Sequence, residues 1–175
     1  MRVAVTGTPG TGKTTAVAEL EASGGLADAD LDVVHLNDAI EPEGLYDERD
    51  AERDSLIVDL DAIREYLADR DDVLVESHLA HHVPADRVVV LRCRPTELER
   101  RLVERGESEP KARENAESEA LDVILAEAVE AHGRDSVYEV ETTDRSPDAV
   151  AEAIAAVIAG EREPSAGTVD YTTYL

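Results

Sequence analysis

The chain has 175 residues, of which 17 are basic and 41 acidic, and its formal net charge is −24. This length fits one domain that buries a core without disulfides or a structural metal. Only Lys13 and Lys111 are lysines, Trp and Phe are absent, and 42% of the residues are hydrophobic. An acidic, lysine-poor chain with periodic aliphatic runs predicts a folded protein that stays soluble in concentrated salt, rather than a generic acidic protein.

Several classes of protein are disfavoured by the sequence. No run of about 18 apolar residues is present, so we expect no membrane-spanning helix. The chain enters an apolar strand at once, without the parts of a signal peptide, which predicts a cytoplasmic protein. Cys93 is the only cysteine, so neither a disulfide nor a multi-cysteine zinc site is expected. The negative charge disfavours direct, sequence-specific binding of nucleic acid.

Short apolar runs alternate with helical patterns along the chain. Strands are predicted at residues 2–6, 33–36, 73–75, 88–91 and 137–140, and helices at 13–21, 56–67, 95–105, 110–132 and 147–159. The polar stretch 37–54 is expected to be a mobile excursion. The tail 161–175 is expected to be a surface extension or partly disordered, outside a domain of residues 1–160. This alternation predicts an α/β fold of three layers, with a five-stranded parallel sheet between helices.

Residues 7–14 match the P-loop pattern G-x-x-x-x-G-K-[ST] between a predicted strand and a predicted helix. Glycines let backbone N–H groups curl around phosphate oxygens at the positive end of the helix dipole. Lys13 supplies a charge for the β- and γ-phosphates, and the Thr14 hydroxyl suits Mg²⁺. The sequence therefore predicts a site for a nucleoside triphosphate with Mg²⁺. The predicted binding residues of this loop are Gly7, Gly10, Thr11, Gly12, Lys13, Thr14 and Thr15.

Further segments follow in the order and spacing of one family, and they are Leu45-Tyr46-Asp47, Val75-Glu76-Ser77-His78, Val90-Leu91-Arg92, Arg105-Gly106, and Asn115 with Glu119. With the P-loop, they make residues 1–160 resemble the adenylate kinase isoenzyme 6 family of small nuclear and archaeal kinases, which is linked to maturation of the small ribosomal subunit. The resemblance implies a nucleoside-monophosphate-kinase fold, with a monophosphate-binding segment near residues 30–53 and a short lid near 104–114. It also implies phosphoryl transfer from ATP to AMP, giving two ADP, an additional ATPase activity, and a basic small-subunit ribosomal protein as partner.

Two positions depart from the pattern of that family. The family usually has Asp-x-His after an apolar strand, where this chain has Glu76-Ser77-His78. Glutamate is one methylene longer and still able to hold a metal-bound water. The stretch 37–48 contains no basic residue, and Glu41 stands where the family often carries an arginine. This departure weakens the expected recognition of AMP, and Arg49 and Arg53 are the candidates to replace that arginine.

Three further side chains are candidates for catalysis. Glu76 ends an apolar strand, where P-loop proteins place a carboxylate that orients Mg²⁺; the alternative is a solvated strand end. His78 is expected to orient the attacking water or the lid, or else to be an ordinary loop histidine. The resemblance places Arg105 against ATP, and the alternative is a cation that complements a helix dipole. The predicted catalytic residues are Lys13, Glu76, His78 and Arg105, Arg105 is also expected to bind nucleotide, and the predicted Mg²⁺ ligands are Thr14 and Glu76.

Other residues carry weaker expectations. Arg101 either shares the role of Arg105 or pairs with Glu97, four residues earlier. Arg92 and Arg94 follow a strand at the end of the sheet where ligands bind in open α/β folds. Residues 142–146 resemble the segment that borders adenine.

Three histidines, His78, His81 and His82, are clustered in the sequence. No cysteine or carboxylate pattern accompanies them, so they give only weak support for zinc. Cys93 is expected to be a small buried residue rather than a nucleophile.

Two functions remain open at this point. The first is adenylate kinase-type phosphoryl transfer from ATP to AMP. The second is an assembly-factor ATPase whose hydrolysis of ATP switches its grip on a basic ribosomal protein.

Overall fold

The structure is a computed structural model that describes residues 1–50 and 55–175. Its main sheet has the strand order β2-β5-β1-β6-β7, and neighbouring strands are parallel throughout. These strands are β1 (Arg2–Thr6), β2 (Asp32–His35), β5 (Val73–Glu76), β6 (Arg87–Arg92) and β7 (Val137–Glu141). The predicted α/β fold with a five-stranded parallel sheet is confirmed.

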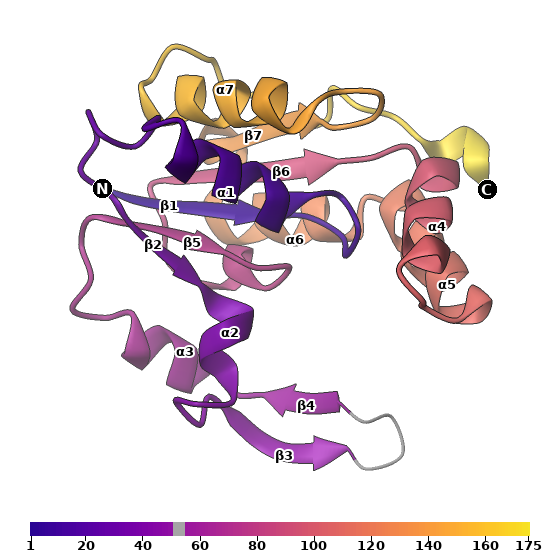
Figure 1. Cartoon of the computed structure of the whole chain (residues 1–175), viewed down its shortest axis with the longest axis horizontal. Coiled ribbons are helices and arrows are strands. Elements are labelled where there is room, and N and C mark those ends of the chain that lie inside the picture. The colour runs from indigo at the N-terminus through magenta and orange to yellow at the C-terminus, as the bar shows by residue number, and fades with distance from the viewer. Residues whose placement is uncertain (51–54) are drawn as a thin grey trace.

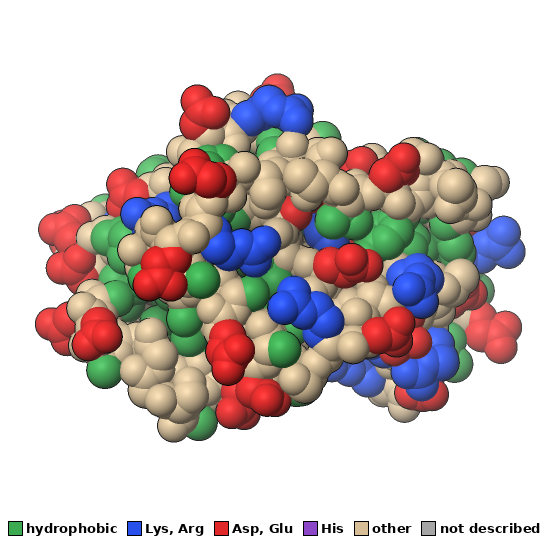
Figure 2. Space-filling model, turned by 90° about the horizontal axis from the view of Figure 1, so that it is seen from above, with side chains coloured by type: hydrophobic (Ala, Val, Ile, Leu, Met, Phe, Trp, Pro, Cys, Tyr) green, Lys and Arg blue, Asp and Glu red, His purple; other side chains and the backbone are tan. Residues whose placement is uncertain are grey.

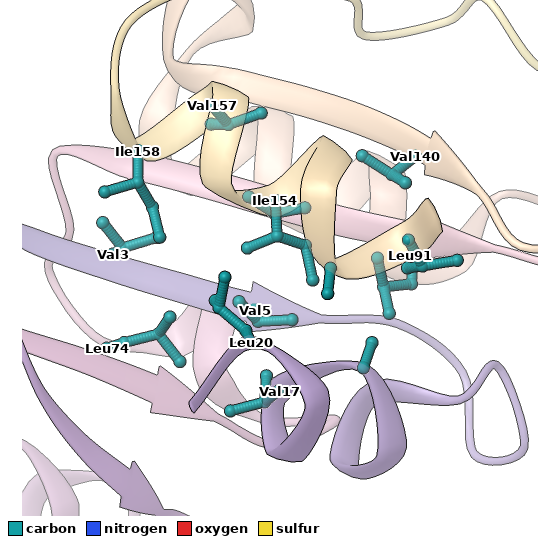
Figure 3. Close-up of a cluster of buried hydrophobic side chains, with 14 of the residues drawn as sticks. Val3, Val5, Val17, Leu20, Leu74, Leu91, Val140, Ile154, Val157 and Ile158 are labelled. Carbon is teal, nitrogen blue, oxygen red and sulfur yellow. The ribbon is translucent and has the colours of Figure 1, made fainter. Parts of the chain in front are cut away.

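Helices cover both faces of this sheet, as Figure 1 shows. They are α1 (Lys13–Ala22), α2 (Leu36–Ile40), α3 (Leu60–Tyr66), α4 (Pro95–Glu104), α5 (Glu109–Ala120), α6 (Val123–His132) and α7 (Pro147–Ile158). One face packs against α1 and α7, and the other against α3 and α6. Because side chains alternate along a strand, Val3 and Val5 of β1 face α1 and α7, while Ala4 faces the other layer. Figure 3 shows Val3 and Val5 in the first of these clusters.

The region between β2 and β5 differs from its prediction. The stretch 37–54, expected to be a mobile excursion, includes most of α2 and the strand β3 (Tyr46–Asp50), while residues 51–54 lie outside the described part. The helix predicted at 56–67 begins only at Leu60, because β4 (Ser55–Val58) pairs antiparallel with β3. Asp59 caps α3, since its carboxylate accepts hydrogen bonds from two backbone N–H groups of the first turn. The helix-like spacing of Leu56 and Leu60 therefore spans a strand and a helix cap.

The single helix predicted at 110–132 is two helices, α5 and α6. The chain turns at Asp122, whose φ of 55° is left-handed. The Asp122 carboxylate forms an ion pair with Arg92 at the end of β6. The turn between α5 and α6 is therefore held by a residue 30 positions away in the sequence. Helical periodicity does not report such a contact, so the break was not predicted.

The tail after α7, expected to be a surface extension or partly disordered, packs back onto the surface of the domain. The backbone N–H of Ser165 donates to the carbonyl oxygen of Val137, and that of Thr168 donates to the Glu139 carboxylate at 2.7 Å. The chain ends beside α4 and α5 (Figure 1), where the Tyr174 hydroxyl donates to Glu99. Within the described residues, no helix is long and apolar enough to span a membrane.

Candidate nucleotide-binding site

The loop between β1 and α1 is held in shape by its own side chains. The Lys13 side chain lies inward, with 7% of the residue exposed, and its Nζ donates to the carbonyl oxygens of Gly7 and Thr8 at 2.8 and 3.1 Å. The Thr11 hydroxyl also donates to the Thr8 carbonyl oxygen, at 2.9 Å. Burial lowers the pKa of Lys13 to about 8. An anion beside the loop would favour the charged ammonium, so the loop is prepared for phosphate.

Glycine is required at two positions of this loop. A Cβ atom at Gly7 would lie 2.6 Å from the carbonyl oxygen of Leu91, on the neighbouring strand β6. Gly12 precedes α1 with a φ of 95°, which L side chains rarely adopt. The backbone can therefore turn its N–H groups toward a ligand at the start of α1.

A buried carboxylate, that of Glu119, hydrogen-bonds to the loop. Glu119 of α5 accepts a hydrogen bond from the Thr8 hydroxyl, and it also accepts from Arg92 Nε at 2.8 Å and from the Cys93 N–H at 3.1 Å. Arg92 was expected at the ligand-binding end of the sheet, but its side chain is 1% exposed and also pairs with Glu139. Arg92 therefore supports the loop from within and does not face the site. Cys93 is buried, as predicted.

Glu76 stands opposite the start of α1. It is the last residue of β5, its side chain is 3% exposed, and the Thr14 hydroxyl lies 3.3 Å from each of its carboxylate oxygens. A hydroxyl and a carboxylate are oxygen ligands of the kind that Mg²⁺ prefers. The two predicted metal ligands are therefore side by side, and their chemistry fits the ion.

His35, which sequence reasoning missed, holds Glu76 in place. Its Nδ1 lies 2.9 Å from Glu76 Oε2, and its Nε2 lies 3.5 Å from a carboxylate oxygen of Glu21. Burial lowers the pKa of His35, but the two carboxylates outweigh burial and raise it. Because β2 and β5 are adjacent in the sheet and His35 pairs with Glu76 in register, the contact follows from topology. The sequence, which separates the two residues by 41 positions, carries no local signal for it.

Two pockets meet above the P-loop. The first, of about 200 Å³, lies between the loop, the end of α4 and the start of α7, and its lining includes Thr11, Ala16, Arg101, Thr142, Arg145 and Val150. The second, of about 190 Å³, is lined by Pro9, Lys13, Thr14, Asn37, Glu76 and His78 among others. Both pockets share Gly10, Gly12, Thr15 and Arg105. All four predicted catalytic residues thus border the second pocket, and part of the segment 142–146 borders the first.

His78 enters the second pocket as a neutral imidazole. Burial, together with the charges of Lys13, His81 and His82, lowers its pKa to about 4. A neutral ring nitrogen can accept a hydrogen bond from water, which a protonated ring cannot.

Arginines from the end of α4 line the pockets. Arg101 Nε pairs with Glu97 at 3.0 Å, as one of its two expectations had it, and Arg101 also borders the first pocket. Arg105 is exposed where α4 ends and borders both pockets. Arg94 is exposed and lies 3.6 Å from Asp144.

The acidic segment between β2 and α3 (residues 36–59) carries Arg49, one of the two candidates for binding a monophosphate. Arg49 of β3 pairs with Glu41. The Arg49 side chain is 50% solvent-exposed and that of Glu41 64%. Arg53, the other candidate for binding a monophosphate, lies outside the described residues. Asn37 borders the second pocket, and its side-chain oxygen accepts a hydrogen bond from Ser77 at 2.8 Å.

Comparison with known proteins gives the family. The AAA domain family matches residues 3–122. Proteins named "Putative adenylate kinase" from Natronomonas pharaonis and Halobacterium salinarum are 65% and 64% identical to this chain, over the full length of both partners. The chain belongs to this archaeal adenylate kinase family. A protein of the same name from Methanosarcina acetivorans is 42% identical, over 86% of this chain and 82% of its own.

Solved structures of other P-loop kinases share the fold. A shikimate kinase from Bacteroides thetaiotaomicron superposes with a TM-score of 0.59 at 16% identity, covering 91% of this chain and 98% of that one. A gluconokinase from Sinorhizobium meliloti 1021 gives 0.53 at 20% identity, covering 91% and 92%. At these identities the likeness establishes the kinase fold alone.

Proposed function

We propose that the protein transfers a phosphoryl group from ATP to AMP, giving two ADP. The observation that carries this proposal is the pair of pockets that meet at Gly10, Gly12, Thr15 and Arg105. In this proposal the first pocket receives the nucleoside of ATP, against Thr142 and Arg145. The second receives the phosphates and the acceptor, between Lys13 and Glu76. The names of the archaeal relatives point to the same substrates.

Phosphoryl transfer depends on positioning and on charge neutralisation. An AMP phosphate oxygen attacks the γ-phosphorus, the bond from that phosphorus to the β–γ bridging oxygen breaks, and ADP leaves. Lys13 and the backbone N–H groups would hold the β- and γ-phosphates, and Arg105 would close over them. Thr14 and Glu76 would hold Mg²⁺, which, when bound, neutralises charge on the phosphates.

We also propose an ATPase activity, in which water replaces AMP as acceptor. The observation that favours it is the Arg49–Glu41 ion pair, because it engages the one described basic side chain of residues 37–50. Hydrolysis needs no monophosphate site, and neutral His78, which borders the second pocket, would accept a hydrogen bond from the attacking water. Low kinase turnover with significant hydrolysis would suit an assembly factor.

The cellular role that we propose is maturation of the small ribosomal subunit, with a basic ribosomal protein as partner. Acidic side chains are spread over the face in Figure 2, with several basic ones near its centre and toward its α4–α5 end. Such a surface complements a basic partner, although concentrated salt screens charges beyond a few ångströms. The same proposal assigns two segments. Residues 30–50 would bind the monophosphate, and the turn around 104–114 would act as a lid.

Measuring ADP production from ATP with and without AMP tests the function. The proposal predicts faster ADP formation with AMP, with two ADP formed for each ATP consumed. Equal rates in both reactions would leave the ATPase alone, and no ATP consumption in either would overturn both activities. The inactive Lys13→Ala variant, prepared in the same way, controls for contaminating kinases.

The net charge of −24 leads us to propose adaptation to salt. Like charges repel over a Debye length of about 30 Å at 0.01 M salt, and over about 3 Å at 1 M. We therefore expect the melting temperature to rise steeply with KCl and the protein to lose compactness at low ionic strength. A melting temperature that does not depend on salt would contradict the proposal.

A further inference from the structure

A second group of ligating side chains lies outside the two pockets. It consists of His81 and His82, in the 3-10 turn after β5 (η1, Ala80–His82), and Glu127 of α6. One ligand atom from each lies within 4.8 Å of the others. The chain brings the carboxylate in from 45 or more residues away, which is why the clustered histidines gave only weak support for zinc in the sequence.

Thr6 contacts one ring nitrogen of His81. The Thr6 hydroxyl oxygen lies 2.9 Å from His81 Nδ1 and 3.3 Å from the carbonyl oxygen of His78. The direction of the contact with His81 follows from the tautomer of the ring, because the hydroxyl can either donate to Nδ1 or accept from Nδ1–H. His81 is 1% exposed. A ring that donates from Nδ1 to Thr6 has a lone pair on Nε2 with which to bind a metal ion.

The Nε2 nitrogens of both histidines lie close to one carboxylate oxygen. His81 Nε2 lies 2.9 Å from Glu127 Oε2, and His82 Nε2 lies 3.9 Å from the same oxygen. Nε2–H can donate to the carboxylate in this contact, and a cation that binds both atoms would take the place of that hydrogen. Ligand atoms around tetrahedral Zn²⁺, at bonds of about 2.0–2.1 Å, are roughly 3.3 Å apart. The two observed separations bracket that spacing.

We propose that His81, His82 and Glu127 bind one Zn²⁺ ion, with water as the fourth ligand. Two imidazoles and one carboxylate are a donor set that suits zinc, whereas Mg²⁺ prefers oxygen ligands. Glu127 is partly exposed, which gives the ion a route from solvent and leaves room for water. Thr6 supplies the hydrogen-bond partner that orients a metal-bound histidine through its other nitrogen.

The proposed ion has a structural role near the site. It joins η1 to α6, and η1 follows directly on the strand and loop that carry Glu76 and His78. His132 Nε2 lies 2.7 Å from the carbonyl oxygen of His81, a further link between the same two elements. Zinc would therefore hold the loop that positions His78 against the body of the domain.

Calorimetric titration of the metal-free full chain with ZnCl₂ tests the proposal. Concentrated KCl screens the exposed carboxylates, and excess Mg²⁺ occupies oxygen-rich sites, so weak binding elsewhere is suppressed. We expect one Zn²⁺ per chain. Glu127→Gln and His82→Ala should each weaken zinc binding by about tenfold or more. The matched control is Glu130→Gln, which removes the same charge from an exposed position of α6 and should bind zinc as the unmodified chain does.

His82→Ala keeps the Thr6–His81–Glu127 contacts, and circular dichroism verifies that each variant is folded. Co²⁺ provides a second readout, because its visible absorption strengthens in a tetrahedral site, and His82→Ala should reduce that absorption. The absence of one-to-one zinc binding would overturn the proposal and leave a hydrogen bond between His81 and Glu127. Equal affinities for Glu127→Gln and Glu130→Gln would also overturn it, because the ion would then lie elsewhere on the acidic surface.

Discussion

The P-loop and the acidic segment between β2 and α3 both border the site. They differ in how firmly their contacts with the rest of the domain hold them. The loop is largely buried, and Lys13, Thr11 and Glu119 all hydrogen-bond to Thr8 within it. The acidic segment projects from the sheet in Figure 1. Its hairpin, β3 with β4, is a separate two-stranded sheet. The segment is anchored by a few buried side chains, Leu36, Ile40 and Leu45.

If the proposed function holds, this contrast predicts how ATP and the acceptor bind. The phosphate cradle is shaped before nucleotide arrives, so binding ATP costs little ordering of the loop. The acidic segment has few anchors and presents Arg49 in an ion pair. An acceptor that uses Arg49 must break that pair first. We therefore expect changes in the loop to affect every activity, and changes in the segment to affect only reactions of the acceptor.

The largest effect is expected from Lys13→Ala. Removing the ammonium deletes a preorganised charge at the β- and γ-phosphates, so kinase and ATPase rates should both fall by about 10³-fold or more. The fold should persist, because the lysine bonds only carbonyl oxygens of its own loop. Rates of both reactions and circular dichroism measure this. Arg70→Ala, which removes an exposed basic side chain outside both pockets, is the control. Activity within a few-fold of the unmodified chain would refute the P-loop assignment.

Glu76→Gln should have the next largest effect. The amide removes the negative charge that faces Thr14, so turnover should fall by about 10²-fold. ATP affinity should change much less, because the backbone N–H groups are untouched. Turnover and equilibrium binding of ATP separate these two effects.

Glu21→Gln is the matched control for Glu76→Gln. Glu21 faces the other nitrogen of His35 and is outside both pockets. It should lower turnover far less than Glu76→Gln. If Glu76→Gln keeps full turnover, Glu76 has no role in holding the metal.

The sequence predicted the buried half of the molecule well because its signals are local. β-Branched runs such as 88–91 mark strands covered on both faces, and the P-loop pattern requires its glycines wherever it occurs. The acidic segment lacks such signals. Leu56 has helical spacing to Leu60, yet pairing with β3 makes residues 55–58 a strand. Pairing between distant segments decides such a case, and single-sequence periodicity does not report it.

The supporting residues of the site were missed for the same reason. His35 reaches Glu76 because two strands are neighbours in the sheet, and Glu127 reaches His81 because α6 crosses the turn after β5. Arg92 was misread because its position at a strand end suggested a ligand contact. Its side chain instead lies on the buried face of β6, where Glu119 and Glu139 neutralise it.

His78→Gly should separate hydrolysis from phosphoryl transfer. Only hydrolysis needs an oriented water, so the rate without AMP should fall by about tenfold or more, while transfer to AMP should fall less. Measuring both rates on one preparation gives the ratio directly. An equal loss of both activities would show that His78 does not act on water.

The smallest effect is expected at the Arg49–Glu41 pair, and it tests the acidic segment directly. If Arg49 meets the AMP phosphate, Glu41 competes for it, and an exposed ion pair contributes about 0.2–1 kcal/mol. Glu41→Gln should then lower the KM for AMP by up to about fivefold, and Arg49→Gln should raise it. ATP hydrolysis without AMP should be unaffected by Glu41→Gln, since the P-loop keeps all its contacts. Glu43→Gln removes the same charge from the neighbouring exposed turn and should leave the KM unchanged. If both glutamate variants lower the KM equally, the segment acts through its general negative charge, and Arg49 has no specific part in receiving AMP.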